Sequence, residues 1–336
     1  MVWEKWHVSL NSDEMKTPSL ISALALLTSS ICQAEEGWTT DFEAAQARAE
    51  KEGKDLLINF TGSDWCKWCI VLKEEVLQHD PFKKGVADKF VLVELDYPNN
   101  QEILEQPIID QNKELQEKYA PPGFPTILLT KADGTPYAQT GYQKGGPDAY
   151  VKHLDELRAI KDALKEGFDA AGAPQDREKK NEALFTTLQK IAPNLLKHYE
   201  EKIDALQAPL EEEQAKFVES YWYNEARYAL EKTINAKIEE EKFDEAIDEV
   251  DKFIAEHTEA NPDQKFGFQG ATHQEILAFK VNLFMAQQEL VKAKEILVEI
   301  VGIDDKTELG VNSKLFIPRL EKMIEQKEAK EAPEEE

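Results

Sequence analysis

The chain has 336 residues, of which 41% are apolar, so it can bury the core of one large domain or of two ordinary ones. Its formal net charge of −26 repels phosphate backbones and anionic lipid, which argues against nucleic acid and membrane surfaces as partners. The three cysteines, Cys32, Cys66 and Cys69, are too few for a fold held together by disulfides.

The N-terminus has the pattern of an export signal that begins at Met15. Lys16 supplies a positive start, an apolar run covers 20–31, and small residues precede a cleavage point after Ala34. The run is too short to span a bilayer comfortably, although an uncleaved anchor is the alternative. We predict that 1–34 is a signal peptide, with 1–14 a mis-annotated extension, and that the mature protein is exported, to the periplasm or beyond.

Between residues 37 and 165, helical and strand patterns alternate. Periodicity predicts helices over 38–53, 66–78, 102–119 and 148–165, and strands over 54–61, 90–95, 126–130 and 137–142. Asp133-Gly134 separates the last two strands and is a strong hairpin signal. This order predicts an α/β fold whose mixed sheet is covered by helices on both faces, with an antiparallel edge.

From about residue 175 the pattern is helical only. Apolar residues recur at spacings of three and four, which predicts an all-α helical-hairpin domain over 175–326. The segments around Ala246 and Ala293 are alike and weakly resemble a degenerate tetratricopeptide array. The charged residues 327–336 are predicted to form a disordered acidic tail.

The residues that carry chemistry are Cys66 and Cys69, in a C-x-x-C that follows a predicted strand and opens a helix. A helix N-terminus favours a thiolate, so we expect Cys66 to be the nucleophile and Cys69 the resolving thiol. Two alternatives stay open. A lone C-x-x-C supplies two of the four ligands of a structural zinc, and the pair could form a structural disulfide across a very short loop. We expect no metal and no cofactor.

Two motifs at their expected spacing resemble the thioredoxin superfamily. The first is Phe60-Thr61-Gly62-Ser63-Asp64-Trp65-Cys66, which looks like secreted bacterial thioredoxin-like proteins, and the second is Gly123-Phe124-Pro125-Thr126. The resemblance covers about residues 37–160. It implies a thioredoxin-like fold and disulfide exchange with protein thiols and disulfides.

The resemblance also implies roles for residues around the dithiol. Pro125 corresponds to a cis-proline that faces the dithiol, and Phe124 to a substrate-contact residue. Trp65 corresponds to the indole that shields the site. Gly141, matched to a glycine of the last strand, would let a partner backbone approach closely.

The chain departs from the family within the motif. Lys67 and Trp68 replace a glycine–proline pair, and the positive charge of Lys67 favours the Cys66 thiolate. Since a stabilised thiolate makes the couple more oxidising, we expect a potential above that of thioredoxin, about −270 mV.

A second departure concerns proton transfer. Asn59 and Phe60 stand where the family has a buried acid, and we assign Leu92 to the position of its lysine partner. Loss of both together leaves no charge buried unpaired. Water, or Asp64 beside the site, would then have to take the proton of the resolving cysteine.

These patterns favour an exported thiol-disulfide oxidoreductase. The main alternative is a non-catalytic thioredoxin-fold binding or scaffold protein with a redox-sensitive dithiol, and a third is a protein that keeps haem-accepting or copper-binding thiols reduced. The chain has no second C-x-x-C, so turnover would require a separate redox partner. The helical domain would bind a protein partner or self-associate.

Overall fold

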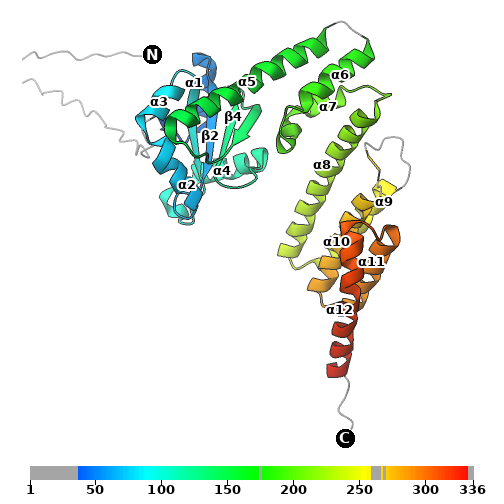
Figure 1. Ribbon diagram of the computed structural model, residues 1–336. Coiled ribbons are helices and arrows are strands. Elements are labelled where there is room, and N and C mark those ends of the chain that lie inside the picture. The colour runs from blue at the N-terminus through cyan, green and yellow to red at the C-terminus, as the bar shows by residue number, and fades with distance from the viewer. Residues whose placement is uncertain (1–36, 174–175, 259–265, 268–269, 332–336) are drawn as a thin grey trace, which may run out of the picture.

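The computed structural model describes residues 37–173, 176–258, 266–267 and 270–331 (Figure 1). The predicted signal peptide and Cys32 lie outside the described residues. Within the described ranges, no helix combines the length and apolar character needed to cross a membrane.

A five-stranded mixed sheet forms the centre of the N-terminal half. Its strands, in the spatial order β1-β3-β2-β4-β5, are β1 (Trp38–Thr39), β2 (Asp55–Thr61), β3 (Phe90–Asp96), β4 (Thr126–Thr130) and β5 (Pro136–Thr140). β3 pairs in parallel with β1 and β2, whereas β4 pairs antiparallel with β2 and β5. The predicted α/β class with an antiparallel closing hairpin is therefore confirmed.

Helices cover both faces of this sheet. They are α1 (Phe42–Glu52), α2 (Lys67–Leu72), the π-helix η1 (Lys73–Leu77), α3 (Asp80–Val86), the short 3-10 helix η2 (Gln101–Ile103), α4 (Gln106–Tyr119) and α5 (Gly146–Gly172). On one face, the ring of Phe60 lies 6.1 Å from that of Tyr119 on α4, which lies 6.2 Å from Phe42 on α1. α2, η1, α3 and α5 pack together on the other face.

Buried charge fixes α5 to the sheet. Asp55, at the start of β2, is 5% exposed and accepts hydrogen bonds from Lys161 at 2.9 Å and from Arg158 at 3.2 Å, both on α5. Tyr137 on β5 donates a further bond to the same carboxylate at 2.9 Å. Because a buried charge is tolerated only when it is paired, these contacts define where α5 crosses the sheet.

Several element boundaries differ from the sequence prediction. Asp41 caps α1 by accepting from Ala44 N at 2.9 Å, so the helix starts at Phe42, and Trp38–Thr39 pairs with β3 instead. The helix predicted over 102–119 starts later, at Gln106, and Pro107 lies in the first turn of α4, where its missing N–H costs no hydrogen bond. The sequence analysis did not predict α3.

The C-terminal half is helical, as predicted. It contains α6 (Arg177–Leu188), the 3-10 helix η3 (Pro193–Tyr199), α7 (Glu200–Asp204), α8 (Glu212–Glu239), α9 (Phe243–Thr258), α10 (Ala271–Ala286), α11 (Leu290–Ile303) and α12 (Glu308–Glu331). α12 runs past residue 327, so the first part of the predicted disordered tail is helical. The tetratricopeptide likeness stays a prediction.

The hydrophobic core continues across residues 165–175, where the sequence pattern changes to helical only. α5 continues to Gly172, and a Cβ on Gly167 would lie 2.0 Å from Thr187 Oγ1, so α6 lies directly against α5. The core of the sheet continues through buried residues of α6, η3 and α7 and ends at Tyr221 on α8. A second core begins at Tyr223 and extends to Leu320. In Figure 1, α8 accordingly runs from the first unit to the second.

His198 lies at the junction between η3 and the sheet domain. Its ring lies 5.4 Å from that of Tyr119, and its Nε2 is buried without a hydrogen-bond partner among the described residues. Burial, followed by the nearby Lys197 and Lys118, lowers its pKa to about 4. The unfolded chain, with an ordinary histidine pKa near 6.5, therefore binds more protons as the pH falls from about 6.5 to 4.

We predict that His198→Phe reduces the loss of stability on acidification. In the wild type, protonation of His198 in the unfolded state adds to that loss over this pH window. The free energy of unfolding, measured by urea titration at pH 7 and pH 4.5, should fall by less in the variant than in the wild type. Equal falls in the two proteins would contradict this assignment.

Candidate redox-active site

Cys66 occupies the N-cap position of α2. Its backbone is extended, with φ −84° and ψ 99°, and its sulfur accepts a hydrogen bond from Cys69 N at 3.2 Å. Cys66 N donates to Gly62 O at 2.9 Å, which closes the loop that leaves β2. The buried strand β2 therefore delivers the motif to the start of the helix, where free amides favour negative charge on Cys66.

Cys66 and Cys69 form a disulfide with their Cα atoms 5.2 Å apart. Both residues are buried, with 6% and 4% of their surfaces exposed. Within the described residues, no three His, Cys, Asp or Glu side chains converge as metal ligands. The structure thus holds the pair in its oxidised form.

Aromatic side chains form one wall beside the disulfide. Trp65 is 47% exposed, and its Nε1 donates to Tyr97 O at 2.8 Å. Its ring lies 5.6 Å from that of Phe124, which lies 5.3 Å from Tyr97. Phe124 precedes Pro125 through a cis peptide bond. These three aromatic residues line a cavity of about 260 Å³.

A second aromatic wall lies on the other side of the motif. The sequence analysis named its Trp68 but not its Tyr142. Trp68 is 52% exposed and stacks on Tyr142, with ring centroids 5.2 Å apart. Tyr142 donates a hydrogen bond to Glu75 on η1, and this bond raises the tyrosine pKa. The sequence offers no signal for this contact, because Tyr142 and Trp68 belong to distant segments.

Gly141 does not lie in the last strand, because β5 ends at Thr140. A Cβ at Gly141 would lie 3.1 Å from Pro125 O. Its own carbonyl accepts a hydrogen bond from Tyr150 on α5 at 2.9 Å. In this structure, the backbone that approaches Gly141 closely is therefore the Phe124–Pro125 loop of the same chain.

Asp64 anchors the loop before the motif. Its two carboxylate oxygens accept from Asn99 N at 2.9 Å and from Asn100 N at 3.0 Å, which lowers its pKa. Ser63 is held in a similar way, by Asp96 on β3. The contacts of Asp64 therefore hold the Asn99–Asn100 loop against the motif, and its part in proton transfer stays a prediction.

The sheet beneath the motif corrects one assignment. Leu92 pairs in register with Leu57, and the residue that faces Asn59 across β2 and β3 is Glu94. Asn59 is 3% exposed, and its Oδ1 has no hydrogen-bond partner among the described residues. The position that we gave to Leu92 therefore holds a carboxylate.

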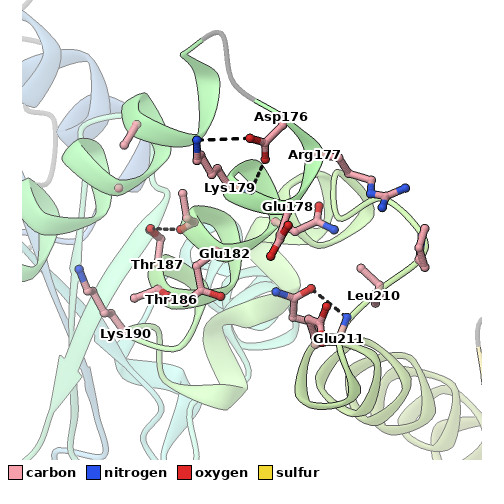
Figure 2. A pocket seen from close by; sticks show the side chains of 16 residues that line it. Asp176, Arg177, Glu178, Lys179, Glu182, Thr186, Thr187, Lys190, Leu210 and Glu211 are labelled. Carbon is pink, nitrogen blue, oxygen red and sulfur yellow. Dashed lines mark hydrogen bonds and ion pairs between the residues drawn. The ribbon is translucent and has the colours of Figure 1, made fainter.

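A larger hollow lies away from the dithiol, between the end of α5, α6 and the start of α8 (Figure 2). Its volume is about 740 Å³, and charges of both signs line it. Some lining residues bind one another: Figure 2 shows Asp176 bound to Lys179. Gln214 Oε1 also accepts a hydrogen bond from Glu211 N at 3.3 Å. No cysteine lies in this lining.

Comparison with known proteins gives the following matches. Residues 37–132 match a family model described as thioredoxin-like. The chain is 33% identical over 138 residues to the disulfide bond reductase DsbH of Chlamydia pneumoniae, which covers 41% of this chain and 78% of that protein. It is 30% identical over 127 residues to the thioredoxin-related protein DsbJ of the same organism, covering 36% of each chain.

Solved structures also match. A DsbH oxidoreductase is 26% identical and aligns over 44% of this chain and 94% of its own, with a TM-score of 0.35. The oxidised C-terminal domain of Neisseria meningitidis DsbD is 15% identical and aligns over 34% of this chain and 90% of its own, with a TM-score of 0.25.

We predict that Lys67→Glu slows alkylation of Cys66. The exposed Lys67 follows Cys66 directly, and reversing its charge disfavours the thiolate by an amount typical of surface ion pairs. In the Cys69→Ser background, iodoacetamide should react about threefold more slowly at pH 7. Lys179→Glu, on α6, makes the same charge change at a distance and should leave the rate unchanged. Equal alkylation rates for Lys67→Glu and its parent would show that the charge of Lys67 does not influence the Cys66 thiolate.

Proposed function

The chain belongs to the thioredoxin superfamily, and we propose that it is an exported thiol-disulfide oxidoreductase that reduces disulfides in polypeptide substrates. One observation carries the proposal: the Cys66–Cys69 pair sits at the N-cap of α2, between two partly exposed aromatic walls. A structural disulfide would gain little from that position, because so short a loop scarcely constrains the unfolded chain.

Two further observations support reduction as the direction of disulfide exchange and export of the protein from the cytosol. The relative of which this chain covers 78% is named a disulfide bond reductase. The pattern from Met15 to Ala34 is that of a cleaved export signal, after which Cys66 and Cys69 are the remaining cysteines. Export exposes the protein to substrates with disulfides, which persist outside the cytosol.

The reaction starts from the dithiol form. The Cys66 thiolate attacks one sulfur of a substrate disulfide, forms a mixed disulfide and releases the first substrate thiolate. Cys69 then loses its proton and attacks Cys66 Sγ, which closes the Cys66–Cys69 disulfide and releases the second substrate thiolate. Two electrons pass from the dithiol to the substrate, so a separate dithiol partner must reduce the protein again. The helical region is the candidate surface for recruiting that partner or for self-association.

A second candidate function is a binding or scaffold protein with a redox-sensitive dithiol. Asn59 favours it, because an amide stands where the resemblance implies a buried acid. The helical region also has its own core, from Tyr223 to Leu320, which is independent of the dithiol.

Trapping experiments separate the two functions. Reduced Cys69→Ser should accumulate a mixed disulfide between Cys66 and a disulfide-containing protein such as insulin, because the resolving thiol is missing. Cys66→Ser should form none. The wild type should catalyse insulin reduction by dithiothreitol, measured as turbidity. Absence of both the adduct and the catalysis in the folded protein would favour the scaffold function.

A further inference from the structure

One face of α8 is directed toward the sheet domain, and its residues follow the helical repeat of 3.6: Phe217, Tyr221, Glu225, Tyr228, Lys232 and Asn235. Tyr221 is the last buried residue of that domain's core, whereas Tyr228, two turns later, is 54% exposed. The described part of the chain therefore leaves the second half of this face largely uncovered. We call it the open face of α8, and it consists of five exposed residues: Tyr228, Ala229, Lys232, Asn235 and Ala236.

The helix behind the open face is held firmly by the second core. Tyr223, Leu230 and Ile234 lie on the opposite side of α8 and are buried there. Their packing fixes the rotation of the helix, so the open face is presented on a rigid element beside the sheet domain. Rigid elements position binding residues more precisely than loops do.

The open face lies next to the helix that borders the dithiol site. Lys232 Nζ lies 3.3 Å from Glu117 Oε2 on α4, and Figure 1 shows α8 on the side of the sheet domain that carries α4. Gln116, the neighbour of Glu117, lines the 260 Å³ cavity together with Trp65 and Phe124. A continuous strip of surface therefore leads from the aromatic wall beside the disulfide, over α4, to the open face.

The open face is nearly neutral in a chain whose net charge is −26. Lys232 is the one charged residue among its five members, and Glu117 pairs with it. Tyr228 offers a large, rigid contact area, Asn235 offers adaptable hydrogen bonding, and the two alanines leave room for a partner. Tyrosine and asparagine serve in this way on surfaces that bind polypeptides of many sequences.

A substrate polypeptide held at Cys66 is the occupant that this arrangement fits. In the mixed disulfide the substrate cysteine is bonded to Cys66 Sγ, so the chain on either side of it must run over the adjoining surface. The strip over α4 offers that chain a path to Tyr228. A second copy of the protein fits less well, because a net charge of −26 makes two copies repel each other.

We propose that the open face of α8 is a docking surface for the polypeptide that forms the mixed disulfide with Cys66. This inference rests on the proposed function and assigns the helical region to substrate binding rather than to recruitment of the reducing partner. The open face takes no part in the bonds made and broken during exchange. It contributes binding free energy only to a substrate long enough to reach from Cys66 to α8.

Tyr228→Ser tests the surface by comparing a polypeptide disulfide with a small one. In the mature chain, with dithiothreitol as reductant, the variant should raise KM for insulin about 10-fold and leave kcat unchanged, because it removes an aromatic contact at the interface. Oxidation of the Cys66–Cys69 dithiol by oxidised glutathione, followed by mass, should keep the wild-type rate. Glutathione is a tripeptide and does not extend to α8.

A matched control and a contact measurement accompany the kinetics. Leu315→Ser removes an apolar side chain that is 73% exposed on α12, and it should leave both reactions unchanged. In the Cys69→Ser background, Tyr228→p-benzoylphenylalanine should photo-crosslink to the insulin chain trapped on Cys66. The same replacement at Leu315 should give no crosslink.

The outcomes separate the docking surface from the proposed function. An unchanged KM for insulin in Tyr228→Ser, or a trapped complex without the crosslink, would overturn the docking surface and leave the face to a reducing partner. Slower reaction of the variant with oxidised glutathione would also overturn it, because the effect would then be structural. So would a wild-type dimer, measured by sedimentation, that Tyr228→Ser dissociates. Failure of the wild type to react with either disulfide would instead count against the oxidoreductase itself.

Discussion

The site depends on Cys66 being both the reactive residue and the cap of α2. The sulfur accepts the hydrogen bond that a serine or aspartate would accept at an ordinary helix start. Its position is fixed from both sides, by the buried strand β2 and by Cys66 N donating to Gly62 O. Because the helix begins at the reactive atom, its free amides act on the thiolate without any added charged residue.

On the sheet face beneath the helices, the buried polar group at the start of β2 has its hydrogen-bond partners, whereas the one further along the strand lacks a donor. Asp55 begins β2 with a full set of partners, and these hold α5 against the sheet. Asn59, further along the same face, has a buried oxygen without a donor. Local departures from full hydrogen bonding are expected where function sets the requirement, and here the departure lies in the layer that also holds Cys69.

Local pattern predicted the fold well where one segment carries its own signal. The apolar runs of β2 and β3, the Asp133-Gly134 hairpin and the C-x-x-C at a helix start all lie within short windows. Features that depend on pairing between distant segments were missed. The strand β1 has only two residues, and the Trp68–Tyr142 stack joins α2 to the loop after β5. Glu94 was identified opposite Asn59 only from the register of β2 and β3. The extent of each core likewise depends on how α6 and η3 pack, which periodicity does not encode.

The central claim is that Cys66 and Cys69 cycle between disulfide and dithiol in the folded protein. The most direct measurement is a glutathione-buffered titration of the mature chain, with Cys66→Ser as the control and far-UV circular dichroism recorded at each point. The account predicts a single two-electron transition between about −120 and −270 mV, with the fold unchanged throughout. A pair that is reduced only as the protein unfolds would contradict it, because the disulfide would then be structural.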